Sequence, residues 1–109
     1  MFRFDPISGP RERIAYARQK QHDRFSRDIK TKCNARMTTR HLRTHCKLST
    51  DSQELIRVAM TELNLSARAY DRILKVSRTI ADLDNQPAIL PEHVSEAIQY
   101  RTFDRTLWI

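Results

Sequence analysis

The residues with the clearest chemical potential are three cations spaced along one helical pattern. Arg68, Arg72 and Lys75 follow one another at i, i+4 and i+7, so a helix would place them along one side. Arg68 falls in the first turn of this pattern, where the helix dipole favours acids over cations. A guanidinium there can bind phosphate oxygens in a two-pronged geometry. The alternative is a solvated Arg68, or one paired with Asp71 or an acid of a neighbouring helix.

Two histidines and two cysteines form a second candidate group. His41 and His45, at i and i+4, could bind one metal ion from one face of a helix. Cys46 follows His45 directly and would point about 100° away, and Cys33 would have to return from a loop. We therefore expect buried thiols and surface histidines here, and we predict no metal site.

Catalysis by this chain alone is not expected. The sequence has one glycine, which rules out a glycine-rich phosphate loop of the Walker A type. It also shows no Ser-His-Asp spacing and no nucleophile elbow. We predict that the chain is not an enzyme on its own.

The positive charge lies in the first half of the sequence. Residues 1–47 hold 13 Lys/Arg and 4 Asp/Glu, whereas residues 48–109 hold 7 and 9. Such a basic half is typical of proteins that bind nucleic acid or an acidic protein face, although charged helix faces are also often merely solvated. The candidate DNA- or partner-binding cations of the first predicted helix are Arg11, Arg13, Arg18, Lys20, Arg24 and Arg27.

The elements that would position these residues are helices. One glycine and four prolines in 109 residues argue against a sandwich or barrel, so we predict an all-α bundle of four to five helices. The predicted helices cover residues 10–27, 40–46, 51–63, 66–83 and 91–100. Residues 10–104 would form one domain, with an irregular segment at 1–9 before it and a tail at 105–109 after it.

The helix predicted over 66–83 has the longest clean amphipathic pattern and should lie at the centre of the bundle. Ser66 is its expected N-cap. Its apolar stripe consists of Ala69, Tyr70, Ile73, Leu74, Ser77, Ile80 and Ala81. We expect Leu55, Val58 and Ala59 of the preceding helix to pack on that stripe.

The ends of the helix over 51–63 also carry signals. Thr50 with Gln53 would form a capping box at its start, with Ser49 as an alternative cap. Asn64 can adopt the left-handed conformation after its end.

The sequence favours a cytoplasmic location. No stretch approaches the length of a membrane span, and the charges of Arg3 and Asp5 flank no apolar run of the kind found in signal peptides. Two cysteines without a secretory context are typical of reduced thiols in the cytosol.

Three sequence runs carry a resemblance to a known family. They are S-A-R-A-Y-D-R-I-L at 66–74, R-T-I-A-D-L at 78–83 and P-E-H-V-x-E-A-I-Q-Y-R at 91–101, with further similarity over 33–47. Together they resemble the C-terminal domain of magnesium-chelatase-like AAA+ ATPases of the ComM type. That family includes competence-related DNA helicases and the motor subunit of magnesium chelatase. The resemblance covers roughly residues 8–104.

The resemblance implies a lid, the small helical domain that follows the nucleotide-binding core of an AAA+ module. Arg68 then corresponds to the sensor-2 arginine, which touches the γ-phosphate of ATP. Arg72 and Lys75 are weaker candidates for contacts to nucleotide or to a neighbouring subunit. ATP and Mg²⁺ would be bound by the parent ATPase and not by this chain alone. The implied partners are the AAA+ core domain and neighbouring subunits of a ring.

Two other functions stay open at this stage. The basic first half suits a parent that acts on DNA, and it equally suits a stand-alone DNA-binding or adaptor module. The second of these alternatives is a helical oligomerisation domain, since residues 89–98 also resemble the end of a histone-like fold.

Overall fold

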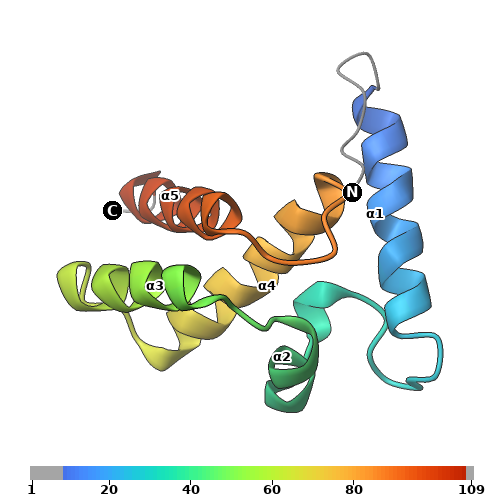
Figure 1. Cartoon of the computed structure of the whole chain (residues 1–109), viewed down its shortest axis with the longest axis horizontal. Coiled ribbons are helices and arrows are strands. Elements are labelled where there is room, and N and C mark those ends of the chain that lie inside the picture. The colour runs from blue at the N-terminus through green and yellow to red at the C-terminus, as the bar shows by residue number, and fades with distance from the viewer. Residues whose placement is uncertain (1–8, 108–109) are drawn as a thin grey trace.

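The central helix of the structure forms where the apolar stripe predicted it. The computed structural model describes residues 9–107, in which six helical elements follow one another. They are α1 (Pro10–Arg24), η1 (Asn34–Arg36, a 3₁₀ turn), α2 (Thr39–His45), α3 (Thr50–Glu62), α4 (Ala67–Leu83) and α5 (Pro91–Leu107). Helix α4 contacts α1, η1, α2 and α5, so it lies at the middle of the arrangement (Figure 1).

The fold class is all-α, as predicted. Within residues 9–107 there is no strand, and an isolated parallel bridge joins Leu48 to Ile89. None of the helices in this range combines the length and the apolar character that crossing a bilayer requires. Most of the predicted irregular start (residues 1–8) and the end of the predicted tail (108–109) lie outside the described residues.

Helix α4 buries the predicted stripe. Its fully buried members are Ala69, Ile73, Leu74, Ser77 and Ala81, and Tyr70 and Ile80 are half-buried against the same core. The Ser66 hydroxyl caps the helix by accepting a hydrogen bond from the Ala69 N–H at 3.2 Å. Before this cap, Asn64 has φ = 52°, which confirms the predicted left-handed turn between α3 and α4.

Two predictions for α3 are wrong. Val58 is 38% exposed, whereas Ile56 and Ser52 are buried. These two buried residues are four positions apart on one side of α3, and Leu55 packs against the same core as predicted, so Val58 is the member of the predicted set that is wrong. The cap is Ser49, whose hydroxyl accepts from the Ser52 N–H, and the expected Thr50–Gln53 box does not form.

Helix α1 is polar and packs weakly, as its thin apolar face predicted. Ala17 is its buried residue, and Ile14 stays 46% exposed. The helix ends at Arg24 and not at Arg27, because the next residue, Phe25, is buried and turns the chain toward η1. Pro10 is at the first helical position, as expected.

The two remaining helices hold the sides of the core. Thr38 caps α2 in a capping box with His41, and Leu42 and Cys46 point inward as predicted. Helix α5 begins at Pro91, buries Val94 and continues to Leu107, well beyond the predicted end at residue 100.

Candidate functional site

Arg68 lies at the second position of α4, in its first turn, and its side chain is exposed. Among the described residues it forms no hydrogen bond and no ion pair, so the alternative pairing with Asp71 is not made. The backbone N–H groups of a helix's first turn lack intrahelical partners and favour a nearby anion. Arg68 and this helix end therefore offer donors to the same region outside the domain.

The cationic side of α4 extends from Arg68 to Lys75. Arg72 is exposed and Lys75 is half-buried. Thr79, one turn after Lys75, faces inward: its hydroxyl donates to the Lys75 carbonyl and accepts from the Asn34 side chain, both at 3.1 Å. The row ends at Lys75 because η1 covers α4 from Thr79 onward.

A buried charge network fixes α4 on the side opposite its solvent face. Asp82 is fully buried and accepts two hydrogen bonds from the Arg24 guanidinium, at 2.8 and 2.9 Å. Asn34 donates to the same carboxylate at 2.9 Å and accepts from Arg24 at 2.8 Å. One carboxylate thereby joins α1, η1 and α4, the three elements that carry these residues.

Arg78 is the second cation of this network. It is 4% exposed, and its Nε lies 3.3 Å from Asp82 Oδ1. Its two terminal nitrogens donate to three backbone carbonyls, those of His45, Gln86 and Pro87, at 2.9–3.3 Å. Burial lowers the pKa of the guanidinium, while the Asp82 charge acts in the opposite direction. Arg78 ties the ends of α2 and α4 and the following loop together.

The candidate cations of the first predicted helix lie on different sides of α1, and the candidate that the structure contradicts is Arg24. Arg24 is inside the network just described and is not a surface residue. Arg11 and Arg18, seven residues apart, are exposed on one side of α1, whereas Arg13 lies about 200° around the helix from Arg11 and lines a groove against α5. Lys20 and Arg27 also lie apart from the other candidates. The Lys20 ammonium lies over the Tyr16 ring at 5.4 Å, and Arg27 lies beyond the end of the helix.

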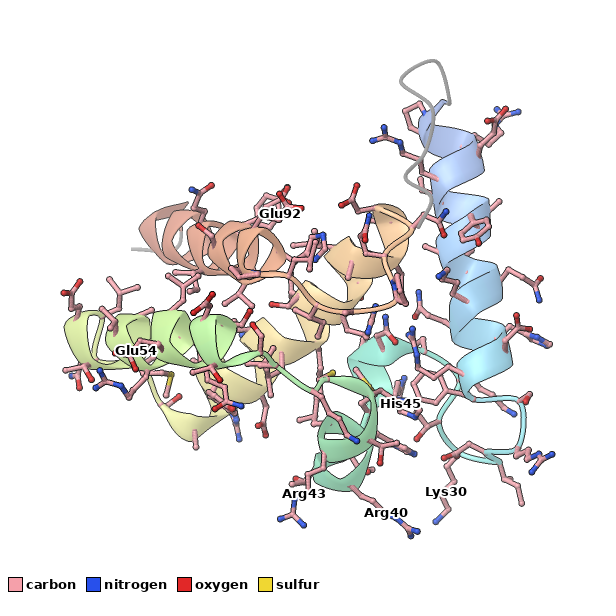
Figure 2. All side chains as sticks on the ribbon, in the orientation of Figure 1. Lys30, Arg40, Arg43, His45, Glu54 and Glu92 are labelled. Carbon is pink, nitrogen blue, oxygen red and sulfur yellow. The ribbon has the colours of Figure 1, made fainter. Side chains whose placement is uncertain are left out.

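A denser basic surface lies elsewhere, and Arg27 is the one of its cations that was predicted from the sequence as a candidate. It is made by the segment after α1, by η1 and by α2, and we call it the basic end. Its exposed cations are Arg27, Lys30, Lys32, Arg36, Arg40, Arg43 and Lys47. Figure 2 shows Lys30, Arg40 and Arg43 pointing away from the body of the molecule. The one acid in this stretch, Asp28, is engaged by His41 at 2.8 Å. The excess of Lys and Arg over Asp and Glu in residues 1–47 was the sequence feature that could have indicated this surface.

The histidine and cysteine candidates are used internally. His41 binds Thr38 through Nδ1 and Asp28 through Nε2, and its ring stacks on that of His45 at a centroid distance of 6.2 Å. Burial, followed by the charges of Arg24, His41 and Arg78, lowers the pKa of His45. Burial raises the pKa of the Cys46 thiol to about 11.

One other group has the ligand types of a metal site. Asp84, Glu92 and His93 place ligand atoms within 4.8 Å of one another. His93 Nδ1 accepts the Leu90 N–H at 2.9 Å, so Nε2 must carry the ring proton in the neutral form, and it lies 3.0 Å from Asp84. A protonated Nε2 has no lone pair for a metal. His93 therefore links the start of α5 to the end of α4.

The domain has recognisable relatives. Residues 8–101 match the family model described as magnesium chelatase, subunit ChlI C-terminal. The chain is 39% identical over 97 residues to the competence protein ComM of Haemophilus influenzae. It is 37% identical over 97 residues to the uncharacterized protein YifB of Escherichia coli, and 36% identical to YifB of Salmonella typhimurium. Each comparison covers 89% of this chain but 18% of the relative. This chain belongs to the magnesium chelatase, subunit ChlI C-terminal family, as a C-terminal domain of ComM-type proteins.

Proposed function

We propose that the domain is the lid of a ComM-type AAA+ ATPase and that Arg68 reaches the terminal phosphate of ATP held by the core. The observation that carries this proposal is an exposed arginine without a partner in the described residues, at the first turn of the most firmly anchored helix. There the guanidinium would stabilise the charge of the transferring phosphoryl group as an electrostatic clamp. ATP and Mg²⁺ would bind to the core, and neighbouring subunits would complete the site.

The arrangement around Arg68 supports a role that depends on position. Helix α4 is tied to α1 and η1 through Asp82, and to the loop at 85–89 through Arg78. A cation on such a helix moves with the whole domain, because the helix cannot tilt without breaking the buried network. The proposed contact would thus report the position of the domain relative to the nucleotide.

A chimeric ATPase tests this proposal. The C-terminal domain of Haemophilus ComM would be replaced by residues 8–101 of this chain, since the two are 39% identical. We expect ATP hydrolysis by the chimera, none by the isolated chain, and a loss on the order of 100-fold in the rate for Arg68→Ala. Arg11→Ala, which removes an equally exposed cation from α1, is the matched control and should leave the rate unchanged. Full activity of Arg68→Ala in a working chimera would refute the sensor role.

A second candidate function concerns DNA. The basic end presents exposed cations, with the nearby acid engaged by His41, and this favours contact with a phosphate backbone. Such a surface supports a parent that acts on DNA. Duplex binding by this chain should weaken steeply as salt rises, and the variant Lys30→Gln/Lys32→Gln should lower the salt dependence more than Arg11→Gln/Arg18→Gln. Duplex binding that does not change with salt concentration, or that is changed equally by the two double variants, would contradict this assignment.

A further inference from the structure

A groove separate from the Arg68 helix end runs between α2, α3 and α4. It has a volume of about 790 Å³, within the range of ligand sites in proteins. Its floor is formed by apolar side chains from all three helices and from the segment that joins α2 to α3. These are Leu42, Cys46, Leu48, Ile56, Met60 and Leu74.

The floor is accessible and not merely the top of the core. Leu48 and Met60 are half-buried, and so is Tyr70 at the side of the groove, whereas Leu42 and Ile56 beneath them are buried. Apolar surface is thus left uncovered where three elements meet. Burying it against a partner would be favourable by roughly 25 cal/mol for each Å² removed from water.

The rim of the groove is positively charged. Arg43 and Lys47 are exposed, and neither forms an ion pair with a described residue. Arg57, on the α3 side, is already paired with Glu54. Asp71 is the acid that lines the groove on the α4 side, and Lys75 acts electrostatically on the Cys46 thiol in the floor. The charge left over at the rim is therefore cationic and complements an acidic occupant.

The shape and the lining favour a protein segment over a nucleic acid. Tyr70 is the one aromatic residue among those that line the groove, and binding of bases relies on stacking on aromatic rings. An aliphatic floor with charges at its edge is the usual complement of an amphipathic helix, which inserts side chains at i, i+3, i+4 and i+7. Phosphate backbones find a better surface in the exposed cations of the basic end that lie outside the groove, such as Lys30 and Arg40.

We propose that the groove between α2, α3 and α4 binds an acidic amphipathic helix of a partner protein. The apolar side of that helix packs on Met60, Leu48 and Tyr70. Its carboxylates pair with Arg43 and Lys47. Arg68 is not among the residues that line the groove, so the proposed helix contact involves other residues than the nucleotide contact proposed for Arg68.

A defined peptide tests the proposal with the full chain. The probe is a fluorescently labelled synthetic helix with leucines at i, i+3, i+4 and i+7 and glutamates at its other exposed positions. A peptide of the same composition in scrambled order and a duplex oligonucleotide serve as comparisons. Binding is followed by fluorescence anisotropy, and the site is mapped by backbone amide chemical shifts.

We expect the amphipathic peptide to bind and to shift the amides of residues 42–48, 56–61 and 70–74. Arg43→Glu/Lys47→Glu should weaken binding on the order of 10-fold or more, whereas Lys30→Glu/Lys32→Glu, which reverses equal charge on the other side of the basic end, should have little effect. Met60→Asp should also abolish binding, with circular dichroism and unfolding curves checking that the variant is folded. All four exchanged cations are exposed, so the charge variants should keep the fold.

Three outcomes would overturn the proposal. Equal binding of the scrambled peptide would mean that charge alone attracts the probe. Equal loss in the two double variants would place the contact outside the groove. Displacement of the peptide by the duplex, with the same groove amides shifted, would assign the groove to nucleic acid.

Discussion

Arg24 and Asp82 are 58 residues apart in the sequence and form a two-pronged ion pair in the interior, with N–O distances of 2.8 and 2.9 Å. The carboxylate is completely buried, and the arginine side chain is 13% exposed. The pair joins the polar helix α1 to the central helix α4, where few apolar contacts are available to do so. The buried ion pair therefore does more to hold α1 against the domain than the small apolar face of this helix does.

Replacing Asp82 with Asn should strongly destabilise the chain. The variant leaves two buried guanidinium groups, those of Arg24 and Arg78, without a counter-charge, and such a loss costs about 3 kcal/mol. Urea unfolding followed by circular dichroism measures the change. Asp23→Asn is the control, because that acid is exposed and should change stability by less than about 0.5 kcal/mol. Equal stability of the two variants would mean that the network is not needed for folding.

The same network marks the limit of what the sequence could predict. The stripe of α4 was readable because burial imposes a period of about 3.6 residues on apolar side chains. A buried arginine does not differ in type or spacing from an exposed one, so Arg24 was placed on a surface and Arg78 was overlooked. Arg78 and Asp82 are four residues apart and could be recognised as a helix pair, but their burial depends on η1 and the loop at 85–89.

The positions of the candidate residues were also predictable only in part. Arg68 was singled out by its place at the start of a helix, and the structure leaves it exposed there. The basic end could not be derived, because its cations come from a loop, a short 3₁₀ turn and α2, and only tertiary contacts bring these together. Helix α3 shows a related problem: Val58 and Ile56 are both apolar, and only the tertiary packing decides which one is buried.

The start of α3 provides a test of which hydroxyl acts as the cap. Ser49→Ala should cost about 1 kcal/mol, because the Ser52 N–H loses its acceptor. Thr50→Ala, one residue later, should cost much less, since Thr50 is exposed at the first helical position and alanine has a higher helix propensity. Thermal unfolding of the two variants gives the comparison. A larger loss of stability for Thr50→Ala would support the Thr50–Gln53 capping box that the sequence predicted.

The two thiols should differ in reactivity. Cys46 is buried with a pKa of about 11, whereas Cys33 is half-exposed. A disulfide reagent at pH 8 should modify the Cys33 thiol quickly and the Cys46 thiol only after denaturation. Cys33→Ser should therefore remove the fast phase of the reaction. Because the folded pKa of Cys46 exceeds its ordinary value of 9.0, the contribution of this thiol to stability should be constant below pH 9 and should be lost between pH 9 and 11. Fast modification of both thiols at pH 8 would contradict the burial of Cys46.

Acid should weaken the domain through His45. Its folded pKa is lowered by burial and by the nearby charges of Arg24, His41 and Arg78, so the unfolded chain takes up a proton at a higher pH than the folded chain does. Stability that is fully present above the ordinary value of 6.5 is therefore lost as the pH falls below it. Urea unfolding at several values between about pH 7 and pH 5 measures this loss.

A pair of variants assigns the acid sensitivity to one ring. His45→Gln should show a smaller decrease in unfolding free energy over the same pH range, because the group that gains a proton on unfolding is gone. His22→Gln is the control, since that side chain is 76% exposed and should leave the wild-type pH dependence unchanged. If the slope of unfolding free energy against pH were the same in both variants and the wild type, His45 would not be the group whose protonation weakens the fold in acid.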